Sequence, residues 1–87
     1  MTENSLYMDI FCHVADILAD RQAKYGGAYQ KTRDEFGPAA FYVKVWDKLY
    51  RLEQADQTGE QTSETAIDSI IDIMGYCALE LAYRQGR

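Results

Sequence analysis

The sequence predicts an all-α fold, a small helical bundle of three long helices and one short connecting helix. In three long segments apolar residues recur at intervals of three and four, and no segment shows the two-residue alternation of a β-strand. Glycines at 26–27, 37 and 59 separate these segments. The chain has 87 residues, 47% of them hydrophobic, which suits a single helical domain over residues 1–87.

The first long helix is expected over residues 5–24. Asn4 or Ser5 can cap its N-terminus, and Gly26 is expected to end it in a left-handed conformation. Its apolar residues share one arc, which predicts the side that faces the core: Leu6, Tyr7, Ile10, Phe11, Val14, Ile17 and Leu18. Four polar residues lie opposite this arc and are expected to face solvent: Asp9, His13, Asp16 and Asp20.

Residues 28–36 are polar and are expected to add one or two helical turns. The only proline, Pro38, suits the first position of a second long helix that runs to about Gln54, because a first helical residue needs no partner for its N–H. The apolar residues of this helix form one wide stripe, in which Trp46 is expected to belong to the core: Phe41, Tyr42, Val43, Val45, Trp46, Leu49, Tyr50 and Leu52.

A polar linker around Gly59 precedes the third long helix, which is expected from Glu64 to Arg84. Thr62 or Ser63 can cap it. Its apolar arc consists of Ile67, Ile70, Ile71, Met74, Cys77, Ala78 and Leu81.

Three carboxylates recur every four residues beside that arc: Glu64, Asp68 and Asp72. Like charges at this spacing destabilise an isolated helix, so they need partners. One partner is Mg²⁺, which takes one or two protein carboxylates together with waters and ligand phosphates. The other is a set of inter-helix salt bridges, formed if the second and third long helices run antiparallel, with Lys44, Lys48 and Arg51.

The same three cations follow one line on the second long helix and can instead clamp a phosphate, with Arg51 forking onto two oxygens. Tyr25, Tyr29 and Tyr76 can stack on a base or line its pocket. The ordinary alternatives are a solvated cationic face and tyrosines in the core.

Charge and cysteine content restrict the partners and the compartment. The net charge of −5 argues against duplex nucleic acid as a partner. No apolar run is long enough for a signal peptide or a membrane span, and no membrane partner is expected. Cys12 and Cys77 are isolated from each other and from any metal-binding spacing. We therefore expect reduced thiols in a cytoplasmic protein.

Three blocks stand in order along the chain: Lys24 to Gly26 (KYG), Asp47 to Leu52 (DKLYRL) and Glu64 to Tyr76 (ETAIDSIIDIMGY). Over residues 21–83 their order and spacing resemble the nucleotide modification associated domain 1 family, small proteins common in bacteriophages. That family is similar to the MazG-like all-α nucleoside triphosphate pyrophosphohydrolases, helical dimers or tetramers that hold Mg²⁺ on acidic residues. The resemblance implies a MazG-like fold, a phage origin and a nucleotide ligand.

The chain departs from these families at two places. Gln22 and Lys24 stand where the phage family has Asn and Asp, and Asp16 and Asp20 stand where MazG-like enzymes carry an E-x-x-E pair. Both aspartates are expected to face away from the core. Because a metal-activated water normally relies on groups on both sides of the ion, this departure favours binding over hydrolysis.

The sequence therefore predicts a nucleotide-binding protein on a MazG-like scaffold, which binds or sequesters a phosphorylated nucleoside with or without Mg²⁺. If a phage encodes it, it acts in the bacterial host cytoplasm. Two alternatives stay open: a Mg²⁺-dependent nucleoside triphosphate pyrophosphohydrolase, and a helical protein–protein interaction module with structural ion pairs. The small size predicts a homodimer or a higher homo-oligomer that buries part of the apolar surface of the first or second long helix.

Overall fold

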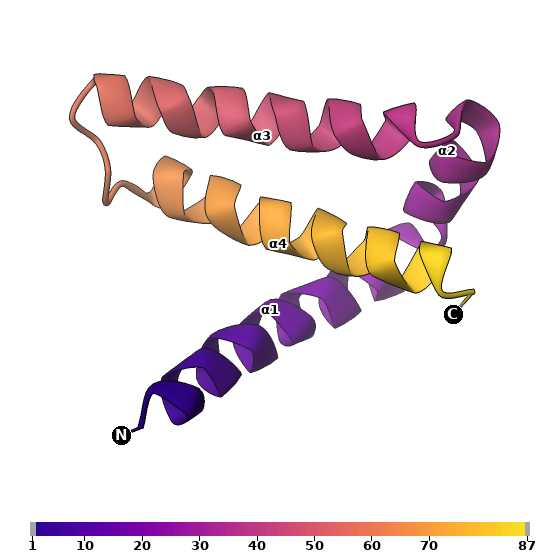
Figure 1. Cartoon of the computed structure of the whole chain (residues 1–87), viewed down its shortest axis with the longest axis horizontal. Helices are drawn as coiled ribbons and strands as arrows, with labels where there is room; N and C mark the ends of the chain where they lie inside the picture. Colours follow the sequence, from indigo (N-terminus) through magenta and orange to yellow (C-terminus); the bar gives the residue numbers. More distant parts are fainter. Residues whose placement is uncertain (1, 87) are drawn as a thin grey trace.

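The computed structural model describes residues 2–86, and within this range it contains four α-helices and no strand. They are α1 (Glu3–Tyr25), α2 (Ala28–Phe36), α3 (Ala39–Gln57) and α4 (Glu64–Arg84) (Figure 1). The predicted all-α fold, with three long helices and a short connecting one, is confirmed.

The helix ends follow capping chemistry, with two shifts of more than one residue from the expected positions. Pro38, expected as the first residue of its helix, is instead the N-cap of α3. Thr2 caps α1, its hydroxyl accepting from the Ser5 N–H at 3.2 Å, so Asn4 and Ser5 lie inside the helix. Gly26 ends α1 with a positive φ of 61°, as expected. Ser63 caps α4, its hydroxyl accepting from the Ala66 N–H at 3.2 Å.

The second shift is at the end of α3, which continues to Gln57. Gly59 then adopts a φ of 78°, and the Glu60 N–H donates back to the Ala55 carbonyl at 2.8 Å. The Gly59 N–H donates to the Asp56 carbonyl, which completes a Schellman motif. Because only glycine adopts this conformation without strain, the helix stops there and the chain turns back.

After that turn, α4 runs antiparallel to α3 along most of its length (Figure 1). Small buried residues allow the two helices to approach: Ala55 on α3, and Ala66 and Ser69 on α4. The Ser69 hydroxyl donates to the Thr65 carbonyl of its own helix, so the buried oxygen leaves no unpaired group.

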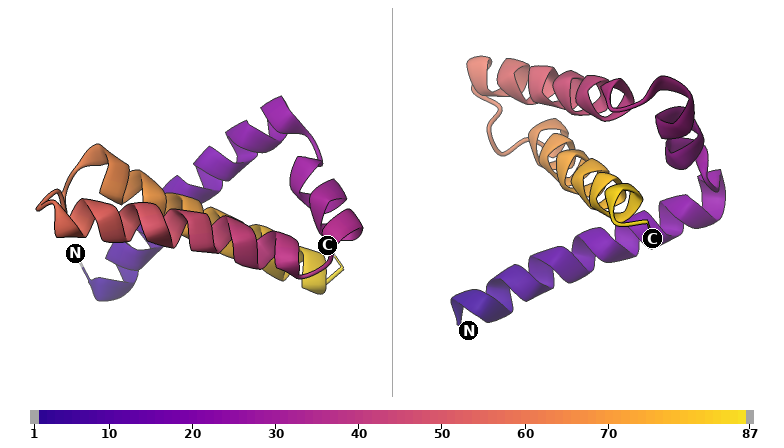
Figure 2. Two further views of the ribbon diagram at one scale, coloured as in Figure 1. Left: turned by 90° about the horizontal axis from the view of Figure 1, so that it is seen from above. Right: turned by 45° about the vertical axis from the view of Figure 1, so that its right-hand side comes forward.

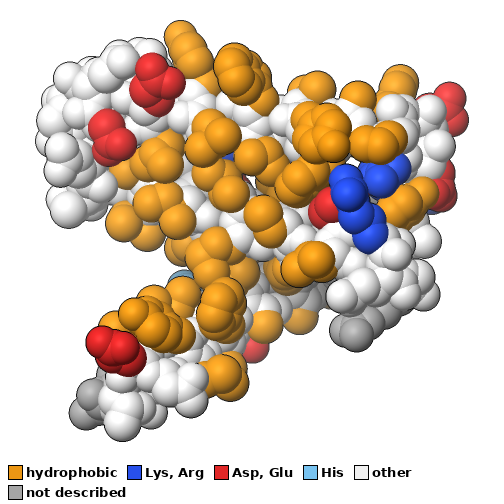
Figure 3. Space-filling model, viewed as in Figure 1, with side chains coloured by type: hydrophobic (Ala, Val, Ile, Leu, Met, Phe, Trp, Pro, Cys, Tyr) orange, Lys and Arg blue, Asp and Glu red, His pale blue; other side chains and the backbone are white. Residues whose placement is uncertain are grey.

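Helix α1 crosses α4 obliquely, as the two further views show (Figure 2). The crossing is close because Gly75 has no side chain: a Cβ placed there would lie 3.2 Å from Leu18 Cδ2. On the N-terminal side of this crossing, α1 diverges from α4 and projects as an arm (Figures 1 and 3).

Little apolar surface is buried within one chain. Among the residues that the structure describes, the buried hydrophobic ones are Val14, Ala40, Ala55 and Ala66. The expectation that Trp46 belongs to the core is wrong within one chain, because Trp46 is 72% exposed. Much of the apolar arcs predicted for the first and third long helices is likewise exposed: Leu6, Tyr7, Ile10, Phe11, Ile67, Ile70, Cys77, Ala78 and Leu81.

Within residues 2–86, no helix combines the length and the apolar character that crossing a lipid bilayer requires.

We expect Gly75→Leu to lower the free energy of unfolding by about 1–3 kcal/mol, because the new side chain overpacks the crossing of α1 and α4. Leu18→Ala should reduce this loss, since it removes the atoms that the new side chain meets. A double-mutant cycle followed by urea denaturation measures the coupling of the two sites. Additive effects of the two substitutions would contradict the close contact.

Candidate functional site

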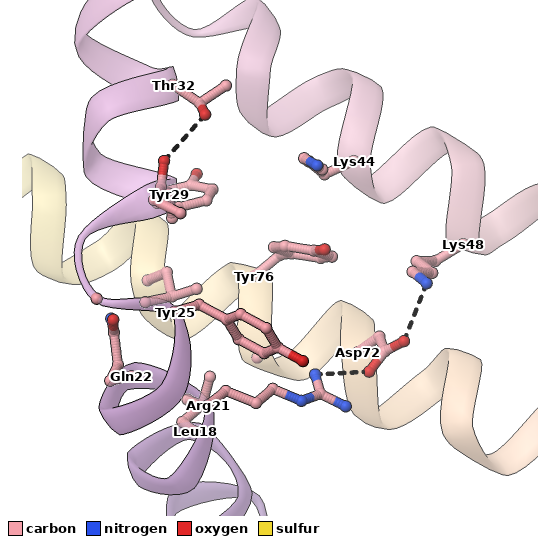
Figure 4. A pocket seen from close by; sticks show the side chains of 14 residues that line it. Leu18, Arg21, Gln22, Tyr25, Tyr29, Thr32, Lys44, Lys48, Asp72 and Tyr76 are labelled. Carbon is pink, nitrogen blue, oxygen red and sulfur yellow. Dashed lines mark hydrogen bonds and ion pairs between the residues drawn. The ribbon is translucent and has the colours of Figure 1, made fainter.

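A pocket of about 450 Å³ lies where the four helices meet (Figure 4). Each helix contributes polar or aromatic side chains to its wall. They are Arg21, Gln22 and Tyr25 from α1, Tyr29 and Thr32 from α2, Lys44 and Lys48 from α3, and Asp72 and Tyr76 from α4.

Helical spacing explains why these residues reach one place. Residues four apart share a side of a helix. Arg21 and Tyr25 are such a pair on α1, and Lys44 and Lys48 are another on α3. Asp72 and Tyr76 form the third pair on α4, and Gly75 lies in the pocket wall beside them. Three sides of the pocket are thus converging helix sides, and Tyr29 and Thr32 of α2 supply the fourth.

Asp72 joins two of these helices to its own. Arg21 Nη1 donates to Asp72 Oδ1 at 2.8 Å, and Lys48 Nζ lies 3.1 Å from Asp72 Oδ2 (Figure 4). Burial alone would raise the pKa of Asp72, but the hydrogen bonds from Lys48 and Arg21 outweigh it and hold the pKa below its ordinary value. The carboxylate therefore stays charged, with both oxygens occupied.

The three predicted metal ligands are not brought together within one chain. Asp72 lines the pocket, whereas Glu64 and Asp68 are exposed on α4 and do not line it. Over residues 2–86, no group of three His, Cys, Asp or Glu side chains is arranged to hold a metal ion. Helix α1 crosses α4 at Gly75 and covers only Asp72 of the three carboxylates.

The three predicted phosphate ligands also separate. Lys44 and Lys48 line the pocket, and the predicted inter-helix pair of Lys48 with Asp72 is present. Arg51 instead lies 3.6 Å from Asp47 on the exposed surface of α3. Arg21 occupies the place expected for a third cation. Its spacing of four residues before Tyr25 was the signal in the sequence that could have identified it.

All three predicted tyrosines line the pocket. The ring centroids of Tyr29 and Tyr76 are 6.1 Å apart and their planes are inclined by 33°. Tyr25 is largely exposed at the pocket mouth. The walls therefore present aromatic surface next to cationic groups.

A buried carboxylate that sequence reasoning missed, Glu80, fixes Tyr29. Glu80 is 4% exposed and accepts from the Tyr29 hydroxyl at 2.6 Å and from Arg33 Nε at 3.0 Å, and it also pairs with Arg84. The hydrogen bond from Arg33, with those from Tyr29 and Arg84, outweighs burial and lowers the pKa of Glu80 to about 2. In the sequence, only the position of Arg84 four residues after Glu80 indicated an ion pair at this carboxylate.

The same contact keeps Tyr29 protonated. Burial, and then the hydrogen bond to Glu80, raise the pKa of the Tyr29 hydroxyl above its ordinary value. A protonated hydroxyl can only donate toward Glu80, so the ring is held in one orientation against the pocket. Arg33 and Tyr29 both come from α2, and the cluster therefore also ties α2 to α4.

The pocket has the opposite charge to the rest of the protein. Its lining holds three cations and one carboxylate, which leaves a formal excess of two positive charges. The whole chain carries a net charge of −5. Cationic groups on concave, partly buried walls concentrate the field and attract small anions.

Comparison of the chain with protein-family models, with curated proteins and with solved structures returns no match.

Stability is expected to fall in acid partly because of Glu80. The lowered pKa contributes stability in full above the unfolded value of 4.5, and this contribution is lost as the pH falls toward about 2. Glu80→Gln should therefore be less stable than the wild type at neutral pH and lose less stability between these pH values. Urea denaturation across the range measures both, with the exposed-site variant Glu64→Gln as control. Parallel curves for wild type and Glu80→Gln would contradict the assignment.

Proposed function

We propose that the chain binds a small phosphorylated nucleoside in the pocket between its four helices. The observation that carries this proposal is the convergence of Arg21, Lys44 and Lys48 with three tyrosines in one cavity. Its volume of about 450 Å³ is in the range of small-molecule sites.

The phosphate faces the cations. Arg21 offers a planar fork suited to two phosphate oxygens, and Lys44 and Lys48 add point charges from α3. Asp72 holds Arg21 and Lys48 before the ligand arrives, which lowers the entropy cost of ordering two long side chains. Lys44 has no such partner in the described chain and is free to turn toward the ligand.

The base lies against the tyrosines. Tyr29 is held by Glu80 and Tyr76 stands beside it, so both rings offer fixed aromatic surface. Stacking on such surface tolerates any base, because every base has a π-face. The tyrosines therefore favour a nucleoside over inorganic phosphate without selecting one base.

Binding without hydrolysis is the favoured form of this function. A Mg²⁺ ion at Asp72 would meet Arg21 and Lys48, whose positive charges repel it, so the residues present do not fit a resident metal. The scaffold we propose is the MazG-like one that the sequence resembles. In a phage-infected cell such a protein would sequester a nucleotide or supply it intact.

Lys44→Ala is expected to weaken nucleotide binding by about 10- to 100-fold, since a charge-assisted hydrogen bond contributes about 1.5–3 kcal/mol. Isothermal titration calorimetry with a panel of nucleoside mono-, di- and triphosphates measures the effect. Lys31→Ala, the same change at an exposed lysine on α2 outside the pocket, is the matched control. Equal losses for the two variants, or no binding of any nucleotide by the wild type, would contradict the proposal.

A nucleotide incubated with the protein and Mg²⁺ is expected to be recovered intact, and chelation of divalent ions should leave its affinity unchanged. Chromatography of the mixture and phosphate release assays measure this. Pyrophosphate release that is lost in Asp68→Asn would instead establish the pyrophosphohydrolase. If neither nucleotides nor divalent ions bind to the protein, the protein–protein interaction module is the remaining alternative.

A further inference from the structure

The charged side chains of the pocket form one group, separate from its aromatic part. Arg21 and Lys48 point toward Asp72 from two different helices (Figure 4). Lys44 precedes Lys48 by one turn on the same side of α3. The other side chains of the lining are uncharged, the three tyrosines among them. The part of the wall that can hold a phosphate is therefore distinct from the part that can hold a base.

The charge of this group limits the charge of the ligand. Asp72 is the one carboxylate among three cations of the lining, which leaves an excess of two positive charges. Asp72 stays ionised, because it accepts from Arg21 at 2.8 Å and pairs with Lys48 at 3.1 Å. A phosphate monoester carries about two negative charges above its second pKa of about 6. One such group therefore neutralises the lining.

Two cations close to the pocket do not add to this charge. Arg33 of α2 pairs with the buried Glu80 at 3.0 Å. Arg51, three residues after Lys48, lies 3.6 Å from Asp47. Neither arginine lines the pocket. A second or third phosphate would thus bring negative charge that the lining does not neutralise.

A longer phosphate chain would also meet carboxylates. Asp72 bridges Arg21 and Lys48, and Asp68 precedes it by one turn on the same side of α4. Polyphosphate sites ordinarily overcome such repulsion with Mg²⁺ bound to carboxylates and phosphates together. Both oxygens of Asp72 already hold cations, so this carboxylate is not open to the ion. Like charges placed together in this way strongly disfavour the wrong ligand.

We propose that the pocket selects a nucleoside monophosphate against the corresponding di- and triphosphates. The single phosphate lies on Arg21, Lys44 and Lys48, and the charge of Asp72 excludes a second one. This inference rests on the proposed function, since it assigns the ligand class of the same pocket. The volume of about 450 Å³ lies in the lower part of the range of small-molecule sites, which suits one base, one sugar and one phosphate.

Isothermal titration calorimetry at about pH 8, where the monophosphate is a dianion, tests this selection. For each common base, four ligands are compared: the nucleoside, its 5′-monophosphate, its 5′-sulfate and its 5′-triphosphate. The sulfate has the shape of the phosphate and one negative charge fewer. The monophosphate should bind at least about tenfold more tightly than each of the other three, with or without Mg²⁺.

Two pairs of variants test whether the charge of the lining sets this preference. Lys44→Ala removes one of the two excess charges and should narrow the gap between monophosphate and sulfate, whereas Lys31→Ala, outside the pocket, should preserve it. Asp72→Asn should improve the binding of the triphosphate relative to the monophosphate. Asp9→Asn changes the net charge of the chain equally at an exposed site on α1 and should not. If Asp72→Asn does not fold, the two lysine variants still decide.

A triphosphate that binds as tightly as the monophosphate, with or without Mg²⁺, would overturn the selection and leave nucleotide binding itself standing. Equal affinities for the monophosphate and the sulfate, or equal effects of the two lysine variants on the gap between them, would also overturn it. Failure of every nucleotide to bind would contradict the proposed function together with the selection.

Discussion

The ion pairs of Asp72 are the contacts on which both the helix arrangement and the pocket depend. One carboxylate on α4 holds Arg21 of α1 and Lys48 of α3, one turn away from the place where Leu18 meets Gly75. Two turns further along α4, Glu80 does the same for α2. In a chain with so few buried apolar side chains, these charged contacts determine where α1 and α2 lie on α4. Removing either carboxylate would leave a largely buried cation, Lys48 or Arg33, without its anionic partner.

The helices and about half of the site could be predicted from the sequence, because both depend on local spacing. Capping residues and glycines located the helix ends to within a few residues, four-residue spacing identified Lys44 and Lys48, and the pocket tyrosines were identified as rings that can stack on a base. Arg21 and Glu80 were missed because their partners are about fifty residues away in sequence. Periodicity also cannot tell which of several regularly spaced side chains a crossing helix covers. For that reason it grouped Glu64 and Asp68 with Asp72.

The limits of periodicity also explain why Trp46 and the apolar arcs of α1 and α4 were expected in the core although they are largely exposed. An apolar stripe shows that a helix buries one side, but not whether its own chain or another copy covers it. Here most of the buried residues are small, and several of the largest apolar side chains, Trp46 and Phe11 among them, are exposed. Helix α1 has two roles. Its C-terminal half supplies Arg21 and Tyr25 to the pocket, and its N-terminal half forms the arm. The Leu18–Gly75 contact lies between them, so the angle of α1 on α4 affects both.

The most direct measurement of the central claim is an NMR titration of the isotope-labelled protein with a mixture of the common ribo- and deoxyribonucleotides. If the pocket binds a phosphorylated nucleoside, the perturbed signals should belong to Arg21, Lys44, Lys48, Tyr29 and Tyr76. Inorganic phosphate alone should perturb the three cations more than the tyrosines. Perturbations that gather on the exposed face of α3 around Trp46, or none at millimolar nucleotide, would contradict the account.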